Sequence, residues 1–205
     1  VGGCSGWAPL GGACLDGHFE CARYLLESGA TVDVKNEHGS TPLLRACYAG
    51  HLECARLLLQ SGADVGAVND MCATPLLGAC YKGATAVARL LLDAHADPDQ
   101  WTRDAETGTA LWPLASACAR GHPAIVEMLL AAGVGRETMR ITLDHAEKRK
   151  HPECTRLVRR ALEQTESGCT TALDDGPCPS PASTERADAA APPASASASP
   201  LSAAD

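Results

Sequence analysis

The sequence predicts an all-α repeat solenoid, in which short helix pairs stack one against the next along the chain. A glycine recurs at Gly17, Gly50, Gly83 and Gly121, with spacings of 33, 33 and 38 residues, and a proline and a Leu-Leu pair keep the same spacings. The composition is 45% hydrophobic but only 3% aromatic, so a packed core has to consist of Leu, Ala, Val and Cys. A period of this length is typical of stacked repeats, because one such unit alone cannot bury its apolar faces.

One repeat, residues 40–72, illustrates how each unit is built. Thr41 is placed as a helix N-cap, and Pro42 follows at the first helical position, where a missing N–H group costs nothing. Gly50 ends this first helix, because glycine adopts the left-handed conformation without steric cost. A second helix follows and stops at Gly62. The apolar residues of this second helix are Leu52, Cys54, Ala55, Leu57, Leu58 and Leu59. They are too many for one narrow stripe, so we expect neighbouring helices to pack against this helix on two sides.

This helix–turn–helix–loop pattern resembles the ankyrin repeat. The residues that carry the resemblance are Thr41-Pro42-Leu43, Ala46, Gly50-His51-Leu52-Glu53, Leu57-Leu58-Leu59 and Gly62-Ala63-Asp64-Val65. The resemblance is strong over residues 7–135 and weak over 136–163. It implies an ankyrin fold with four clear units and a degenerate C-terminal capping unit. It says little about function, because the shared residues build the scaffold and the variable ones select the partner.

The repeat register divides the chain into segments. We expect an N-terminal extension, four repeats of which the third has an extended loop, and a capping repeat; these are residues 1–6, 7–39, 40–72, 73–110, 111–139 and 140–165. The last segment, 166–205, is rich in Ala, Ser and Pro. Such a composition buries too little apolar area to offset chain entropy, so we expect a disordered tail.

Several departures from the repeat pattern distinguish this chain. The first unit has Ala8 where threonine is expected, which suggests a worn or truncated end. The loop before the fourth unit, residues 99–111, is five residues longer than its counterparts and leads into Trp112. The family usually has histidine after Thr-Pro-Leu, and this polar support is lost here; the residues at that position are Gly11, Leu44, Leu77 and Ala115.

The net charge of −8 is unevenly distributed. Residues 1–135 hold 8 basic and 14 acidic side chains, residues 136–165 hold 8 and 5, and residues 166–205 hold 1 and 6. Binding to phosphates requires clustered Lys and Arg, so we expect no nucleic-acid partner; only the basic segment 136–165 offers an alternative. No apolar run approaches the roughly 20 residues of a membrane span, and the N-terminus lacks a signal-peptide layout. We expect no membrane contact and a cytoplasmic or nuclear protein.

Eleven cysteines are many for a chain of this length. Most recur at fixed repeat positions, which favours an interpretation as small buried hydrophobic residues; these are Cys14, Cys47, Cys80 and Cys118 in first helices and Cys21, Cys54 and Cys154 in second helices. Equivalent positions in neighbouring units lie roughly 10 Å apart, too far for disulfides or shared metal ligation. The pattern favours a reducing compartment. Cys72 is expected to be exposed, as an incidental thiol or, alternatively, a reactive one.

The sequence contains no catalytic constellation. Three common motifs are missing from the sequence: the nucleophile elbow, the phosphate-binding glycine loop and the zinc-protease helix. The histidines recur at the turn between the two helices, where a turn-capping role is favoured over metal binding; they are His18, His51, His122 and His151. We therefore predict no enzymatic activity, no cofactor and no metal site.

Three arginines, Arg23, Arg56 and Arg89, recur at 33-residue intervals. Glu20 and Glu53 precede the first two by three residues. Side chains three residues apart face one another on a helix, so we expect local ion pairs rather than a binding site.

In ankyrin-like stacks, partners usually contact the loop tips and the exposed side of the first helices. Projected onto this chain, that rule selects aromatic, basic and apolar residues of units two to four as partner-binding candidates: Arg45, Tyr48, Met71, Tyr81, Lys82, Trp101, Arg103 and Trp112, with Leu44 and Leu77 beside them. Tyr, Trp and Arg dominate binding energy at protein interfaces. The alternative is structural: Tyr48 and Tyr81 stack on one another, and Trp112 plugs the stack.

We therefore predict a monomeric, non-catalytic adaptor or scaffold that binds a protein or peptide through its concave surface and loop tips. The chain begins at Val1 and ends in a linker-like tail, so an alternative is the targeting or regulatory segment of a larger enzyme or channel. A further alternative is contact of the basic segment 136–160 with phosphate-rich ligands.

Overall fold

The computed structural model describes residues 8–103, 110–147 and 151–167. The chain divides into two units, residues 1–170 and 171–205, and all described residues belong to the first. The predicted N-terminal extension and nearly all of the predicted disordered tail lie outside the described residues.

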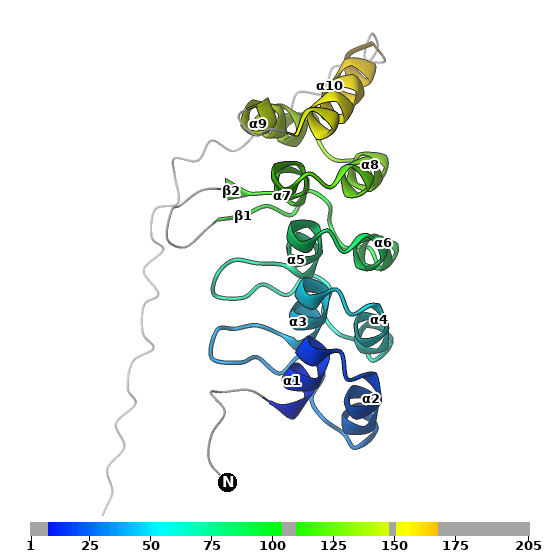
Figure 1. The fold of residues 1–205 in the computed structure, drawn as a ribbon. Helices are drawn as coiled ribbons and strands as arrows, with labels where there is room; N and C mark the ends of the chain where they lie inside the picture. The colour runs from blue at the N-terminus through cyan, green and yellow to red at the C-terminus, as the bar shows by residue number, and fades with distance from the viewer. Residues whose placement is uncertain (1–7, 104–109, 148–150, 168–205) are drawn as a thin grey trace, which may run out of the picture. The chain divides into compact units, whose positions relative to one another are not determined.

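The described residues form a stack of helix pairs, which confirms the predicted repeat solenoid (Figure 1). The first helices of successive pairs pack side by side in one layer, and the second helices form the other layer (Figure 1). In chain order the helices are α1 (Pro9–Asp16), α2 (Phe19–Glu27), α3 (Pro42–Ala49), α4 (Leu52–Gln60), α5 (Pro75–Lys82), α6 (Thr85–Asp93), α7 (Pro113–Arg120), α8 (Pro123–Ala131), α9 (Arg136–Glu147) and α10 (Pro152–Ser167). None of these described helices is long and apolar enough to span a membrane.

The N-termini of the first helices follow the predicted capping pattern. The hydroxyl oxygen of Thr41 accepts a hydrogen bond from the backbone N–H of Leu44 at 3.3 Å, and Thr74 does the same for Leu77 at 3.1 Å. A proline opens each of α1, α3, α5 and α7. The N-cap position of α7 is Trp112, which forms no side-chain cap, so this helix lacks one stabilising contact that α3 and α5 have.

The core consists of small and aliphatic side chains. Each first helix of units one to four contributes one fully buried leucine, and they are Leu10, Leu43, Leu76 and Leu114. The first-helix cysteines are buried as predicted, and burial raises the pKa of the Cys14, Cys80 and Cys118 thiols to about 12. These thiols are therefore protonated at neutral pH and behave as apolar groups. The prediction was wrong for Cys21, which is exposed because it lies on the solvent side of α2.

Histidines form one kind of link between successive units, which we call the histidine rung. The Nε2–H group of His51 donates to the backbone carbonyl of Leu15, 2.9 Å away in the last turn of α1. The ring lies over Gly17, where a Cβ atom would come within 2.5 Å of Nδ1. Side chains in the same position lie over Gly83 and Gly121; they are His122 and His151. The histidines thus reach across to the turn of the preceding unit, and His51 makes no cap bond within its own helix.

Aspartates form a second kind of link, the aspartate rung. The carboxylate of Asp33 accepts from the backbone N–H of Asp64 at 3.1 Å. The carboxylate of Asp99 accepts from the N–H of Gly135 at 2.6 Å. Gly66 occupies the same repeat position between these two, so this junction lacks the rung.

The extended loop of the third unit forms a β-ribbon at its base, where a loop without strands was expected. Strand β1 (Thr102–Arg103) pairs antiparallel with β2 (Ala110–Leu111), and Thr102 lies opposite Leu111. The five-residue insertion lengthens both arms of this loop, which allows them to pair. Residues 104–109, between the strands, lie outside the described residues.

Candidate partner-binding surface

A cluster of aromatic and basic side chains lies at the C-terminal ends of α3, α5 and α7. We call Tyr48, Tyr81, Lys82 and Arg120 the tyrosine strip. The rings of Tyr48 and Tyr81 stack with centroids 6.0 Å apart and an interplanar angle of 18°. Each ring is 39% exposed, so the stack covers only part of each tyrosine.

Cations from the following unit lie over each tyrosine ring. The Nζ atom of Lys82 lies 4.5 Å from the centroid of the Tyr48 ring. The Cζ atom of Arg120 lies 3.7 Å from the centroid of the Tyr81 ring. Ring quadrupoles attract cations at such distances. The strip is thus an alternating set of rings and cations that crosses three units.

The backbone of α5 approaches α3 closely beneath this strip. A Cβ atom at Gly78 would lie 3.6 Å from the Cα and Cβ atoms of Tyr48, which is ordinary van der Waals contact. Arg45 occupies the equivalent repeat position in α3 and is half-buried. Partial burial lowers the pKa of the Arg45 guanidinium, and Tyr48 counteracts this effect. The guanidinium remains charged, because the pKa of arginine starts far above neutral pH.

The loop tips that precede α3 and α5 are held together by hydrogen bonds. The backbone N–H of Asp70 donates to the carbonyl of His38 at 3.1 Å. The side-chain amide of Asn69 donates to the hydroxyl of Ser40 at 3.1 Å. These bonds link the loop that precedes α3 to the loop that precedes α5, so residues exposed on these two loops belong to a connected surface.

The four remaining candidates are Met71, Trp101, Arg103 and Trp112, which lie on the loops between units or directly after them. Met71 is exposed at the tip of its loop, and Trp101 is 55% exposed where the extended loop begins. Val68 occupies the same repeat position as Trp101 one unit earlier and is also exposed. Trp112 is half-buried at the start of α7. Arg103 lies in β1, and its side chain lies outside the described residues.

Two residues named beside the candidates are not accessible to a partner. Leu44 and Leu77 are only 5% and 7% exposed, so their prediction as surface residues was wrong. Both follow the capping threonine by three residues, where their backbone N–H groups bind the threonine hydroxyl and their side chains turn into the stack. The sequence reasoning also missed Arg120. Its place 38 residues after Lys82, the same spacing that separates Gly83 from Gly121, was a signal that could have identified it.

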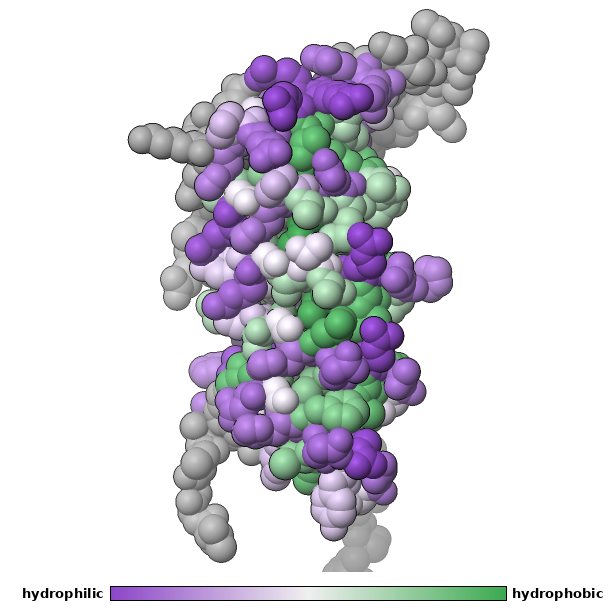
Figure 2. Space-filling view, turned by 45° about the vertical axis from the view of Figure 1, so that its right-hand side comes forward, coloured by the Kyte–Doolittle hydropathy of each residue, from purple (hydrophilic) through white to green (hydrophobic). Residues whose placement is uncertain are grey.

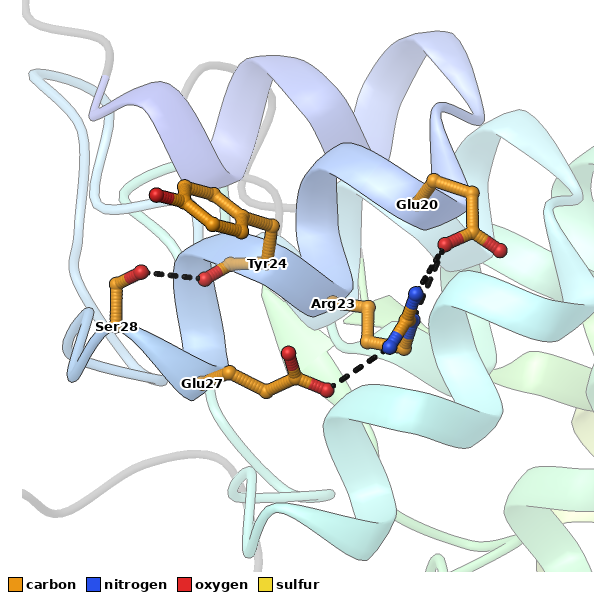
Figure 3. Close-up of polar contacts among 5 residues, drawn as sticks. All are labelled: Glu20, Arg23, Tyr24, Glu27 and Ser28. Carbon is orange, nitrogen blue, oxygen red and sulfur yellow. Dashed lines mark hydrogen bonds and ion pairs between the residues drawn. The ribbon is translucent and has the colours of Figure 1, made fainter.

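The opposite face of the stack carries paired charges. Arg23 on α2 binds Glu20, with 3.1 Å from Nε to the carboxylate, and Glu27 at 3.0 Å (Figure 3). Arg56 on α4 lies 3.9 Å from Glu53. The predicted local ion pairs are confirmed for both arginines. Seen toward this side, hydrophobic side chains form an interrupted band along the stack with hydrophilic side chains on either side (Figure 2).

Within the described ranges, no group of three or more His, Cys, Asp and Glu side chains converges in a way that could hold a metal ion. The buried thiols have raised pKa values and lie among apolar neighbours, so the described cysteines of the core are poor nucleophiles.

Comparison with protein-family models places this stack among known repeats. A model of ankyrin repeats in three copies matches residues 2–69, and a model of a single ankyrin repeat matches residues 72–103. No significant match was found among curated proteins. Ankyrin repeats are in general protein–protein interaction modules and are typically non-catalytic. Because the helix pairs and both matches agree, the chain is an ankyrin-repeat protein.

Proposed function

We propose that this protein is a non-catalytic adaptor or scaffold that binds a protein or peptide partner through the tyrosine strip and the adjacent loop tips. The observation that carries the proposal is the pair of stacked, partly exposed tyrosines with a cation over each ring. Among the described residues, few large apolar side chains are exposed, and Tyr48, Tyr81, Met71 and Trp101 belong to that group.

The energetics of interfaces support this surface. Binding energy is concentrated in a few Tyr, Trp and Arg side chains that are held rigid before the partner arrives. The Tyr48 and Tyr81 rings are restrained by stacking on one another and by the cation over each ring. When a partner covers these rings, the two tyrosine side chains lose little further conformational entropy, and apolar surface is buried.

The loop tips extend the same surface. Met71 supplies a flexible thioether that adapts to different partner shapes, and Trp101 supplies a large flat ring. Arg45 lies in α3, Trp112 directly precedes α7, and Arg103 lies in β1 at the base of the extended loop. We assign this loop the role of distinguishing the partner of this protein from those of other stacks, because the insertion is absent from the neighbouring units.

We further propose that the protein acts as a monomer, without a cofactor, in a reducing compartment such as the cytoplasm or nucleus. The recurrence of cysteines at core positions supports a reducing compartment, because oxidation of buried thiols would disrupt the packing. The acidic net charge of −8 supports a protein rather than a nucleic-acid partner.

The test combines Tyr48→Ala, Tyr81→Ala and Trp101→Ala in one protein and measures capture of partners from the native organism after crosslinking. We expect the triple variant to lose the partners that the wild type captures, because it loses three exposed ring surfaces. The control is Tyr24→Ala, which removes a 70% exposed tyrosine from α2 on the other layer and should leave capture intact. Circular dichroism checks that the helices persist. Unchanged capture by a folded triple variant would contradict the proposed surface.

A further inference from the structure

We infer that the tyrosine strip recognises an acidic segment of a partner protein, with carboxylates placed over Lys82 and Arg120. This inference rests on the proposed function and specifies its ligand. Its basis is the charge pattern of the inner helices α3, α5 and α7, which differs from the charge pattern of the rest of the chain.

The inner helices carry only positive charge. Arg45, Lys82 and Arg120 lie on α3, α5 and α7, and none of the three helices contains an Asp or Glu. The whole chain has a net charge of −8, so this local excess of cations runs against the average composition. An acidic ligand gains Coulomb attraction at this surface, and a basic one is repelled.

Lys82 and Arg120, the cations of the strip, have no acidic partner among the described residues. Across the described residues, neither Lys82 nor Arg120 forms an ion pair with a carboxylate; each lies over a tyrosine ring instead. The contrast is Arg23 on α2, which is held between the carboxylates of Glu20 and Glu27 (Figure 3). Arg23 and Arg56 on the second-helix layer are thus paired locally with glutamates, whereas Lys82 and Arg120 of the strip retain their capacity to bind an anion.

The tyrosine rings position these cations for binding. A lysine side chain that is free in solution loses rotamer entropy when a carboxylate fixes it. Lys82 and Arg120 are already placed over rings at 4.5 and 3.7 Å, so part of that loss has occurred before the ligand arrives. The ring edges and phenol hydroxyls next to the cations add apolar contact and hydrogen-bond donors.

The spacing of the strip indicates the form of the ligand. The helices that carry Lys82 and Arg120 are neighbours in one layer, and packed helices lie about 8–10 Å apart. An extended peptide advances about 3.3 Å per residue, so carboxylates two or three residues apart would reach both cations. A nucleic acid fits less well, because its affinity depends on many phosphate contacts and the strip supplies few cations.

The experiment selects binders to the full-length protein from a displayed library of random peptides. We expect the enriched peptides to contain pairs of Asp or Glu two or three residues apart, together with an apolar residue. Synthetic peptides from the selection should bind the Lys82→Gln/Arg120→Gln variant about tenfold more weakly than the wild type, since two exposed charge pairs are lost. Their affinity for the wild type should fall as salt concentration rises.

The matched control is the Arg56→Gln/Arg89→Gln variant. It changes the net charge by the same amount but alters cations on α4 and α6 of the other layer. Acidic peptides should bind it within about twofold of the wild type, because long-range charge effects are screened. An equal loss in both variants would overturn the assignment of the carboxylates to the strip.

A Tyr48→Ala/Tyr81→Ala variant separates failure of this inference from failure of the proposed function. Enriched peptides that are neutral, and that need the two tyrosines but not the two cations, would overturn the acidic ligand and leave the proposed surface standing. Peptides that bind without need of the tyrosines would overturn both. Binding of a single-stranded oligonucleotide with the same dependence on Lys82 and Arg120 would also overturn the assignment to an acidic peptide.

Discussion

Two residues occupy the left-handed backbone conformation that glycine takes at the same position of other units. His95 has a φ of 63°, where Gly62 one unit earlier has 84°, and Cys72 has a φ of 55°, where Gly39 has 66°. A side chain in this conformation costs roughly 1 kcal/mol relative to glycine. The stack therefore carries a small local strain at one second-helix C-terminus and at one loop tip.

We predict that His95→Gly raises the free energy of unfolding by about 0.5–1 kcal/mol, because relief of the strained conformation exceeds the added entropy of the unfolded chain. The reciprocal change, Gly62→His, should lower it by a similar amount, since a Cβ atom at Gly62 would meet no neighbour within 4 Å and only the backbone conformation is affected. Urea denaturation of both variants measures the two effects. A loss of stability in His95→Gly would show that its side chain contributes more than the strain costs.

His122 makes the stability of the stack sensitive to pH. Partial burial lowers the pKa of His122 below its usual 6.5, and the nearby Arg120 and His151 lower it further. The folded state therefore binds this proton less readily than the unfolded state. The contribution of His122 to the free energy of unfolding is fully present above pH 6.5 and is lost as the pH falls through the lowered pKa.

The corresponding prediction is that the urea midpoint decreases between neutral pH and about pH 5, and that this decrease is smaller in the His122→Gln variant. Glutamine keeps a polar side chain of similar length but does not titrate. The comparison of the two pH profiles isolates the contribution of His122 from that of the carboxylates. Parallel profiles would mean that His122 titrates alike in the folded and unfolded states.

At the scale of helices and turns, the junctions between units are not equivalent. His51, His122 and His151 form histidine rungs to the preceding unit, but the matching residue of the third unit is Ala84. The aspartate rung is missing at Gly66, in the loop that joins the second unit to the third. Both rungs are thus missing at the junction between the second and third units, whereas the junction between the third and fourth units has both; Tyr48 stacks on Tyr81 across the weaker junction.

We expect Ala84→His to restore the missing rung and to stabilise the protein by about 0.5–1.5 kcal/mol. The Cβ atom of Ala84 already lies 3.7 Å from where a Cβ of Gly50 would be, so a ring there would lie over that turn and reach the carbonyl of Tyr48. His51→Ala is the opposite change and should destabilise by about 1–2 kcal/mol. Thermal unfolding followed by circular dichroism compares the variants, and equal stability of Ala84→His and wild type would mean that no rung forms.

The sequence predicted elements better than it predicted contacts between them. Thr41, Pro42 and Gly50 act through their own backbone neighbours, so the helix ends were predictable from local physical chemistry. The partner of His51 lies 36 residues away, and nothing local indicates which turn its ring covers. The ribbon of β1 and β2 was missed for the same reason, because pairing depends on two arms that meet only after the stack has formed.

At the scale of the whole described stack, two faces differ in how they treat charge. On the second-helix layer, Arg23 and Arg56 pair with neighbouring glutamates, whereas the first-helix layer places Lys82 and Arg120 over tyrosine rings. Repeat spacing identified Tyr48, Tyr81 and Lys82 as neighbours on one face in advance. It did not show that the cations lie over the rings, because that depends on rotamers, nor that Leu44 turns inward.

The most direct test of whether a partner binds at the tyrosine strip is hydrogen exchange of the full-length protein, measured with and without a bound partner or selected peptide. If the partner binds there, we expect slowed exchange in the loop tips around residues 68–73 and at the C-terminal ends of α3 and α5, with little change in α2, α4 and α6. Binding at the strip buries the former and leaves the latter in contact with solvent. Protection confined to α2, α4 and α6 would contradict the account and place the binding surface on the second-helix layer.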